Sequence, residues 1–309
     1  MKLQQVLKVS LDELRMQMLG VQVLFGFQFQ GLFQDNSAAL PAAGRMVDAA
    51  GLGLMVVALG LMIAVPCQHR MVDGGETTPR IYAAARWYAQ LALLPLAGGI
   101  GCDVFVATSG QFGPLLAAVF SIAIFVLALL GWYALGIGLR RRWSANAQGV
   151  PMQHEETSLH TKIDQLLTEA RVILPGAQAL VGFQLVVMLS KAFDRLPPEV
   201  KAVHLAALLS LALAIVLLIC PAAIHRIAFG GADDPRLHSA GSLLITIALL
   251  PLAVAISCDL WVALTILFGE GVAALAGAAA AFALLMALWF LLPLFLRRHV
   301  GPAAVAMRQ

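Results

Sequence analysis

The chain has 309 residues, of which 61% are hydrophobic and only 12% are charged. Soluble domains contain roughly 45–50% apolar and about 25% charged residues, so an ordinary soluble domain is excluded. The net charge of +3 does not indicate nucleic-acid binding, because the basic residues lie between apolar blocks. Those blocks are about 20 residues long, the length that crosses a hydrocarbon layer of about 30 Å, and they predict an integral membrane protein in a lipid bilayer.

The first element, at 1–14, has charged residues and leucines at helical spacing. It predicts an amphipathic lead-in helix on the membrane surface rather than a signal peptide. A polar stretch at 143–158 predicts a linker, and 159–168 then repeats the lead-in pattern. No segment alternates with period two, which argues against a transmembrane barrel. The apolar segments lie at about 15–33, 46–66, 86–107 and 114–139, and again at about 171–189, 202–223, 240–264 and 270–296.

The chain contains one unit twice. With a constant offset of 156 and no gap, 13–142 and 169–298 are identical at 43 of 130 positions. Such self-similarity indicates duplication and fusion of an ancestral unit. We therefore expect a first four-helix repeat at 1–142, a cytoplasmic linker at 143–158 and a second four-helix repeat at 159–309.

The basic residues predict the orientation. If both termini and the connections 67–86, 140–171 and 226–239 share one side, that side holds 16 of the 20 Lys and Arg residues. This asymmetry predicts that both termini are cytoplasmic. Because each repeat crosses four times, the second repeat enters in the same direction as the first. The expected fold is an all-α membrane protein of eight transmembrane helices, built as two parallel repeats with a pseudo-twofold axis along the membrane normal.

The sharpest candidates for function are Asp103 and Asp259, each following a cysteine in a matching apolar frame. An ionised carboxylate in hydrocarbon costs several kcal/mol, so an acidic residue there is a functional candidate by default. Both residues suit a proton carrier or a cation ligand. The alternative is structural: Asp103 lies near the expected turn at 108–113 and caps or borders it.

Two further groups of polar residues recur in both repeats. One is a stripe on the first helix of each repeat, for which interhelical hydrogen bonding is favoured over lining a pore: Arg15, Gln22 and Gln28, with Arg171, Gln178 and Gln184. The other is expected at the cytoplasmic helix ends, where Glu13 could pair with Arg70 and a histidine could sense pH. A network that only fixes helix ends is favoured there. Its members are Glu13, His69 and Arg70, with Glu169, His225 and Arg226.

Catalytic and cofactor motifs are not recognisable. The chain has no phosphate-binding loop, nucleophile elbow or H-E-x-x-H motif, so an enzyme is not expected. The four cysteines form no C-x-x-C pair and are expected to be buried small hydrophobes. Haem binding by His69 and His225 has no other cue, and neither a metal nor a cofactor is expected.

The phrase Glu-x-Arg-x-x-x-x-Gly-x-Gln-x-Leu-x-Gly-Phe, a later His-Arg and an Asp late in the third helix resemble a family of short four-helix bacterial membrane proteins of unknown function. The resemblance implies a bacterial inner membrane location and a fused pair of family units. Some family members have a sodium:proton antiporter label, which gives a hint of ion transport. The first repeat departs from the pattern at Leu19, where the second has Pro175. In the second repeat the matching residues are Glu169, Arg171, Leu174, Pro175, Gly176, Gln178, His225, Arg226 and Asp259.

Two functions follow as expectations. The first is movement of protons or a small monovalent cation, with Asp103 and Asp259 as carriers or ligands. The second is a non-catalytic membrane scaffold or subunit whose polar residues only hold helices together. Carboxylates that face a cavity would favour the first, and carboxylates that cap the outer turn would favour the second.

Overall fold

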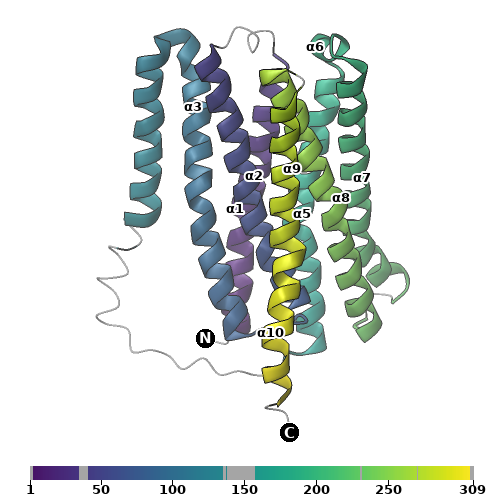
Figure 1. Ribbon diagram of the computed structural model, residues 1–309. Coiled ribbons are helices and arrows are strands. Elements are labelled where there is room, and N and C mark those ends of the chain that lie inside the picture. Colours follow the sequence, from purple (N-terminus) through teal and green to yellow (C-terminus); the bar gives the residue numbers. More distant parts are fainter. Residues whose placement is uncertain are drawn as a thin grey trace.

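The computed structural model describes residues 3–34, 41–134, 137, 157–229, 232–269 and 271–306, and every regular element in these ranges is helical (Figure 1). Six helices are long and apolar enough to cross a membrane. The multi-pass membrane protein expected from composition is therefore supported. The elements are α1 Leu3–Gly31, α2 Ala42–Met71, α3 Pro79–Leu129, η2 Leu130–Ala134, α5 Leu159–Met188, α6 Lys191–Asp194, α7 Pro198–Ile227, α8 Pro235–Phe268, α9 Val272–Met286, η3 Ala287–Leu291 and α10 Leu292–Ala306.

The helical stretch Pro79–Ala134 has 56 residues. A straight helix of that length would extend about 84 Å, nearly three hydrocarbon thicknesses. It is instead divided at Gly113, whose φ of 79° lies in the left-handed region that favours glycine. The chain reverses there into an inner arm (79–112) and an outer arm (114–134) (Figure 1). Gly269, 156 positions later, ends α8 with a φ of 84°.

The turn expected at 108–113 is shorter in the structure. The helix continues through residue 112 and only Gly113 leaves helical geometry. The hydroxyls of Thr108 and Ser109 donate back to carbonyls one turn earlier, on Val104 and Val106, so these polar side chains do not interrupt the helix.

The lead-in helices are not separate elements. α1 is one helix from Leu3 to Gly31, and its Leu11 and Leu14 side chains are buried in the core. α5 likewise covers both the repeated lead-in and the first predicted span of the second repeat. Ser158 caps its start by accepting a hydrogen bond from the Thr161 amide (3.2 Å). A helix of about 30 residues is about 45 Å long, so it covers the predicted lead-in and span together. Residues 143–156 of the predicted linker lie outside the described residues.

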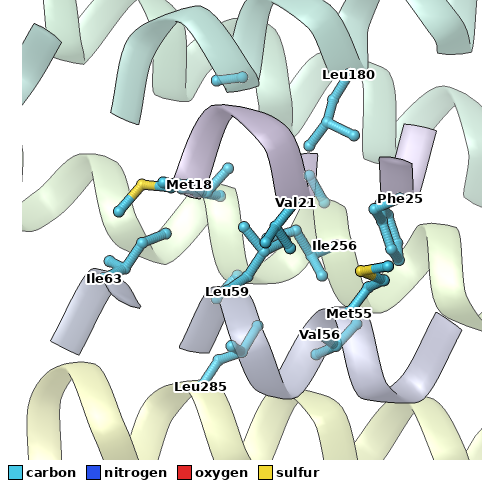
Figure 2. Close-up of a cluster of buried hydrophobic side chains, with 14 of the residues drawn as sticks. Met18, Val21, Phe25, Met55, Val56, Leu59, Ile63, Leu180, Ile256 and Leu285 are labelled. Atoms are coloured by element: carbon cyan, nitrogen blue, oxygen red, sulfur yellow. The ribbon is translucent and has the colours of Figure 1, made fainter. Parts of the chain in front are cut away.

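The core forms around α2, which contacts α1, α3, α8, α9, η3 and α10. Its buried side chains meet those of α1, α5, α8 and α9 in one apolar layer (Figure 2). The layer has no polar side chain among the residues drawn in Figure 2, which include Met18, Val21, Phe25, Met55, Val56, Leu59, Ile63, Leu180, Ile256 and Leu285.

Contacts within each repeat are alike: α1, α2 and α3 contact one another as α5, α7 and α8 do. Between the repeats, the equivalent helices α1 and α5 pack directly together. Two glycines allow their close approach. A Cβ at Gly176 would collide with the Gln22 side chain, and a Cβ at Gly26 would collide with the Phe183 ring.

The fourth helices pack differently. In the second repeat α9, η3 and α10 lie against α2, and Trp289 Nε1 donates to the Gly60 carbonyl (3.0 Å). A Cβ at Gly60 would already lie 3.1–3.2 Å from Leu285 and Leu288. The position equivalent to Gly60 in α7 is Val216, whose side chain is exposed. The outer arm of α3 instead stands at the edge of the bundle (Figure 1), with apolar side chains exposed along it.

Both termini lie at one end of the bundle, which we call the proximal end (Figure 1). The connection 72–78 between α2 and α3 lies at this end, whereas α6 and the reversal at Gly113 lie at the opposite, distal end. Candidate sites therefore fall into a distal and a proximal group.

Candidate functional site

A glutamine–aspartate pair recurs in both repeats. In the first, Gln28 Nε2 of α1 donates to Asp103 of the inner arm. In the second, Gln184 Nε2 of α5 donates to both oxygens of Asp259 on α8, at 2.9 and 2.7 Å. The sequence placed the aspartates and the glutamines in separate groups, and the structure brings each aspartate against its glutamine.

In the first repeat this pair faces a cavity of about 980 Å³ at the distal end, here named the distal cavity. It lies between α1, α2 and the inner arm of α3. Its walls combine apolar side chains with two carboxylates, three amides and one hydroxyl. The lining residues are Leu24, Phe27, Gln28, Gly31, Gln34, Pro41, Asp48, Asp103, Val106, Ala107, Ser109, Gly110 and Gln111.

Asp48 is the residue that sequence reasoning missed. It lies in the second turn of α2, is 7% exposed, and lines the distal cavity with Asp103. Among the described residues its carboxylate has no hydrogen-bond or ion-pair partner. The signal was its place inside the apolar segment predicted at 46–66. At the third position of that segment it resembled a polar boundary residue.

The matching region of the second repeat is closed. Asp259 is 1% exposed, and the position equivalent to Asp48 is occupied by His204. His204 is fully buried, donates from Nε2 to the Gln184 carbonyl (3.2 Å), and packs among the rings of Phe29, Phe33 and Phe193.

Small and polar residues of the distal cavity are replaced by larger apolar ones in the second repeat. Gly31 corresponds to Val187, and Gln111 corresponds to Leu267. Both replacements are buried. The two carboxylates that the sequence treats as equivalent therefore have different surroundings, one open and one enclosed. In the described hydrogen bonds neither one caps the following turn.

A cluster of charged residues forms at the proximal end, and it joins the two repeats. His69 Nδ1 and Arg70 Nη1 of α2 each lie 2.5 Å from one oxygen of Glu169 on α5, and all three side chains are buried. Arg70 thus pairs across the repeats with Glu169 and not with Glu13, which is exposed. The equivalent Arg226 is also exposed and His225 is half-buried. Glu13, His225 and Arg226 therefore form no matching buried cluster among the described residues.

The connection 72–78 strengthens the same junction. Lys162 Nζ of α5 donates to Glu76 (2.5 Å), and the Thr77 amide donates to Thr157 Oγ1 (3.0 Å). Partial burial alone would raise the pKa of Glu76. The hydrogen bonds that Glu76 accepts from Lys162 and Thr157, together with the positive charge of Lys162, outweigh burial and hold the pKa below the ordinary glutamate value. The charge pair is therefore formed at neutral pH.

The polar stripe on the first helices does not form one surface. Gln22 is fully buried against Gly176, whereas the equivalent Gln178 is exposed. Arg15 and Arg171 are both exposed. In the described part of the chain, Gln28 and Gln184 are the members of the stripe that meet a charged partner. Within the described ranges, no three His, Cys, Asp or Glu residues come together as metal ligands.

Comparison with known proteins agrees with the repeats. Residues 2–136 and 153–293 each match a family of unknown function, DUF6328. The chain belongs to this family. The two matches cover the two repeats in tandem, as expected for a fused pair of DUF6328 units. No curated protein and no solved structure matches the chain. The description of DUF6328 names no activity, so the sodium:proton antiporter label suggested by resemblance gains no support from it.

Proposed function

We propose that this DUF6328 protein crosses the bacterial inner (plasma) membrane eight times, as two parallel four-helix repeats about a pseudo-twofold axis. Six candidate helices, one of them divided into two arms at Gly113, give seven crossings, and α1 would be the eighth because it packs against α5, its equivalent in the second repeat. Gly269 ends α8 at the same place in the second repeat. The proximal end has most of the basic residues, which supports cytoplasmic termini.

Within that arrangement we propose that the protein moves protons or a small monovalent cation. The observation that carries this proposal is the pair of carboxylates, Asp48 and Asp103, on the wall of the distal cavity. A carboxylate buried without a partner is costly, and a proton or cation removes that cost. Asp103 would be the carrier or ligand, Gln28 would hold it in place, and Asp259 would have a structural role.

A route for an ion from the distal cavity to the proximal end is closed in this conformation. Asp48 and His69 lie 21 residues apart on α2, which is about 31 Å along a helix and about one hydrocarbon thickness. Between them lies the apolar layer of Figure 2, followed by the cluster of His69, Arg70 and Glu169. Transport would require the repeats to part along this layer, with the distal cavity closing.

One observation favours the alternative, a non-catalytic scaffold or subunit. The outer arm of α3 exposes a continuous apolar surface that includes Leu115, Ile122 and Leu127. Lipid covers such a surface in a monomer, and a partner helix would cover it in a complex.

The test is flux through the purified protein in liposomes loaded with pH-sensitive and sodium-sensitive dyes. The proposal predicts movement of protons, sodium or potassium down an imposed gradient, above the leak of empty liposomes. Protein that is folded and correctly inserted but moves none of the three under any gradient would overturn it and favour the scaffold.

A further inference from the structure

The distal cavity is much larger than a proton or an alkali ion needs. Its volume of about 980 Å³ lies at the upper end of the range of about 300–1,000 Å³ that holds drug-sized organic ligands. A dehydrated alkali ion is held by a few oxygen ligands in contact with it. The volume therefore points to an organic ligand.

The charge of the cavity selects the sign of that ligand. Its lining contains two carboxylates and no Lys, Arg or His. Asp48 is more than nine-tenths buried, faces the cavity and has no partner in the described part of the chain. Asp103 has the Gln28 amide as its donor, and Gln28 Oε1 is buried without a partner. These groups accept hydrogen bonds and stabilise positive charge, and they disfavour an anion.

The remaining lining suits an apolar body. Leu24, Phe27, Pro41, Val106 and Ala107 line the cavity beside the carboxylates. The Phe27 ring packs against the Phe183 ring, with centroids 4.6 Å apart, but is still 57% exposed, so part of it has room to meet a ligand. Aromatic rings attract ammonium groups through their negative faces.

The second repeat provides an internal comparison. It keeps the glutamine–aspartate pair but has His204 at the position of Asp48, Val187 at that of Gly31 and Leu267 at that of Gln111. The second carboxylate and the small residue Gly31 are both lost there. Their joint presence in the first repeat is therefore not required for folding the four-helix unit.

We propose that the distal cavity binds an organic monocation, a protonated amine or quaternary ammonium with an apolar body, between Asp48, Asp103 and the Phe27 ring. The second repeat takes no such ligand and keeps its glutamine–aspartate pair as an internal support. This inference rests on the proposed function in sharing Asp103 as the charged group, and it names the class of substrate that the cavity admits.

Binding of tetraphenylphosphonium to the purified full chain in neutral detergent, measured by calorimetry, tests the inference. Tetraphenylborate is the matched control, because it has the same shape and the opposite charge. We expect saturable binding of the cation at one site per chain and no saturable binding of the anion. Asp48→Asn and Asp103→Asn should each raise Kd about tenfold or more, as expected when a charge-assisted contact is removed.

Two variants separate a ligand site from a general effect on folding. Gly31→Val introduces the residue of the second repeat, and because a Cβ at Gly31 meets no atom within 4 Å the fold should tolerate it while the cavity is partly filled. It should weaken binding. Asp259→Asn, in the enclosed pair, should leave Kd within about twofold, because it is not in the cavity lining.

Equal binding of cation and anion, or equal loss of binding in Asp48→Asn and Asp259→Asn, would overturn the inference. Calorimetry needs no gradient, so its result is independent of flux. Cation binding without any ion movement would overturn the proposed function and leave the site. Movement of protons or sodium without binding of the organic cation would overturn this inference and leave the proposed function.

Discussion

At the scale of single residues, one substitution between the repeats changes the chemistry of the candidate site. Asp48 of the first repeat corresponds to His204 of the second. The aspartate faces a cavity without a partner, and the histidine is fully buried among aromatic rings with a hydrogen bond to the Gln184 carbonyl. Two carboxylates on an open wall can hold a cation, whereas one enclosed carboxylate with a glutamine cannot admit it.

The proximal cluster leads to a stability prediction. Glu169→Gln should lower the free energy of unfolding by about 3–5 kcal/mol, because it leaves Arg70 buried without its counter-charge. The matched control is Glu13→Gln at the equivalent position of the first repeat. Glu13 is exposed, so its replacement should change stability by less than about 0.5 kcal/mol. Denaturant unfolding of both variants in detergent measures the difference, and similar losses would contradict the asymmetry of the cluster.

At the scale of elements, a glycine in the left-handed region marks the reversal between third and fourth helices in both repeats. Gly113 and Gly269 have φ values of 79° and 84° at equivalent positions. A residue with a Cβ is strained there, and glycine is not. Elsewhere along the same chain glycines serve helix packing: Gly26 and Gly176 allow α1 to approach α5.

Replacing Gly113 by alanine should cost about 1–3 kcal/mol of stability, because its φ of 79° and ψ of 165° lie in a backbone region that essentially only glycine adopts. Gly53 is the control: it lies within α2, and a Cβ there meets no atom within 4 Å. Gly53→Ala should stabilise the helix by about 0.5–1 kcal/mol, since alanine loses less backbone entropy than glycine. Thermal unfolding of the two variants gives the signs. A stabilising Gly113→Ala would show that the reversal does not need glycine.

The elements also show why some boundaries are not readable from sequence. Each apolar block lies mostly within a helical stretch, because hydrocarbon thickness sets the length of an apolar run, but helices extend beyond the blocks: α3 begins at residue 79 rather than 86, and α5 at 159 rather than 171. The lead-in at 1–14 resembles a separate surface helix because its pattern is amphipathic. In the structure Leu11 and Leu14 face the core, and nothing in the pattern distinguishes packing on a bundle from lying on a membrane.

At the scale of the whole molecule, the bundle is a duplicated unit whose copies pack unequally. Gly60 lets Trp289 reach the backbone of α2, whereas the equivalent position on α7 is Val216, which is exposed. α9, η3 and α10 cover α2, while the outer arm of α3 stands apart (Figure 1). A fused pair can depart from symmetry in this way, because each copy can change independently, unlike the identical chains of a homodimer.

The sequence was sufficient to predict the helical class and the duplication, because the length of apolar runs and the identical positions can be read directly from it, and it singled out Asp103, which lines the distal cavity. It could not place Asp48 beside Asp103, since they lie 55 residues apart on different helices. Nor could it distinguish Glu13 from Glu169 as the partner of Arg70, because both copies have the same residues at the helix ends and only packing between the repeats decides.

Topology can be tested with single cysteines introduced into a cysteine-free background and a thiol reagent that does not cross membranes. A probe at Gln111, at the distal end, should react from outside intact cells. A probe at Ala228, just after α7 at the proximal end, should react only after permeabilisation. Labelling of Ala228 from outside would reverse the orientation.

The two equivalent glutamine–aspartate pairs are proposed to have divided their roles, with the first repeat holding the functional carboxylate. The most direct measurement is ion flux in liposomes for Asp103→Asn and Asp259→Asn, reconstituted to equal density and compared with the unaltered chain. Asparagine keeps the size and most hydrogen bonds of aspartate but cannot ionise. We predict that Asp103→Asn abolishes flux and that Asp259→Asn retains most of it. Equal loss in both, or full flux in Asp103→Asn, would contradict the account.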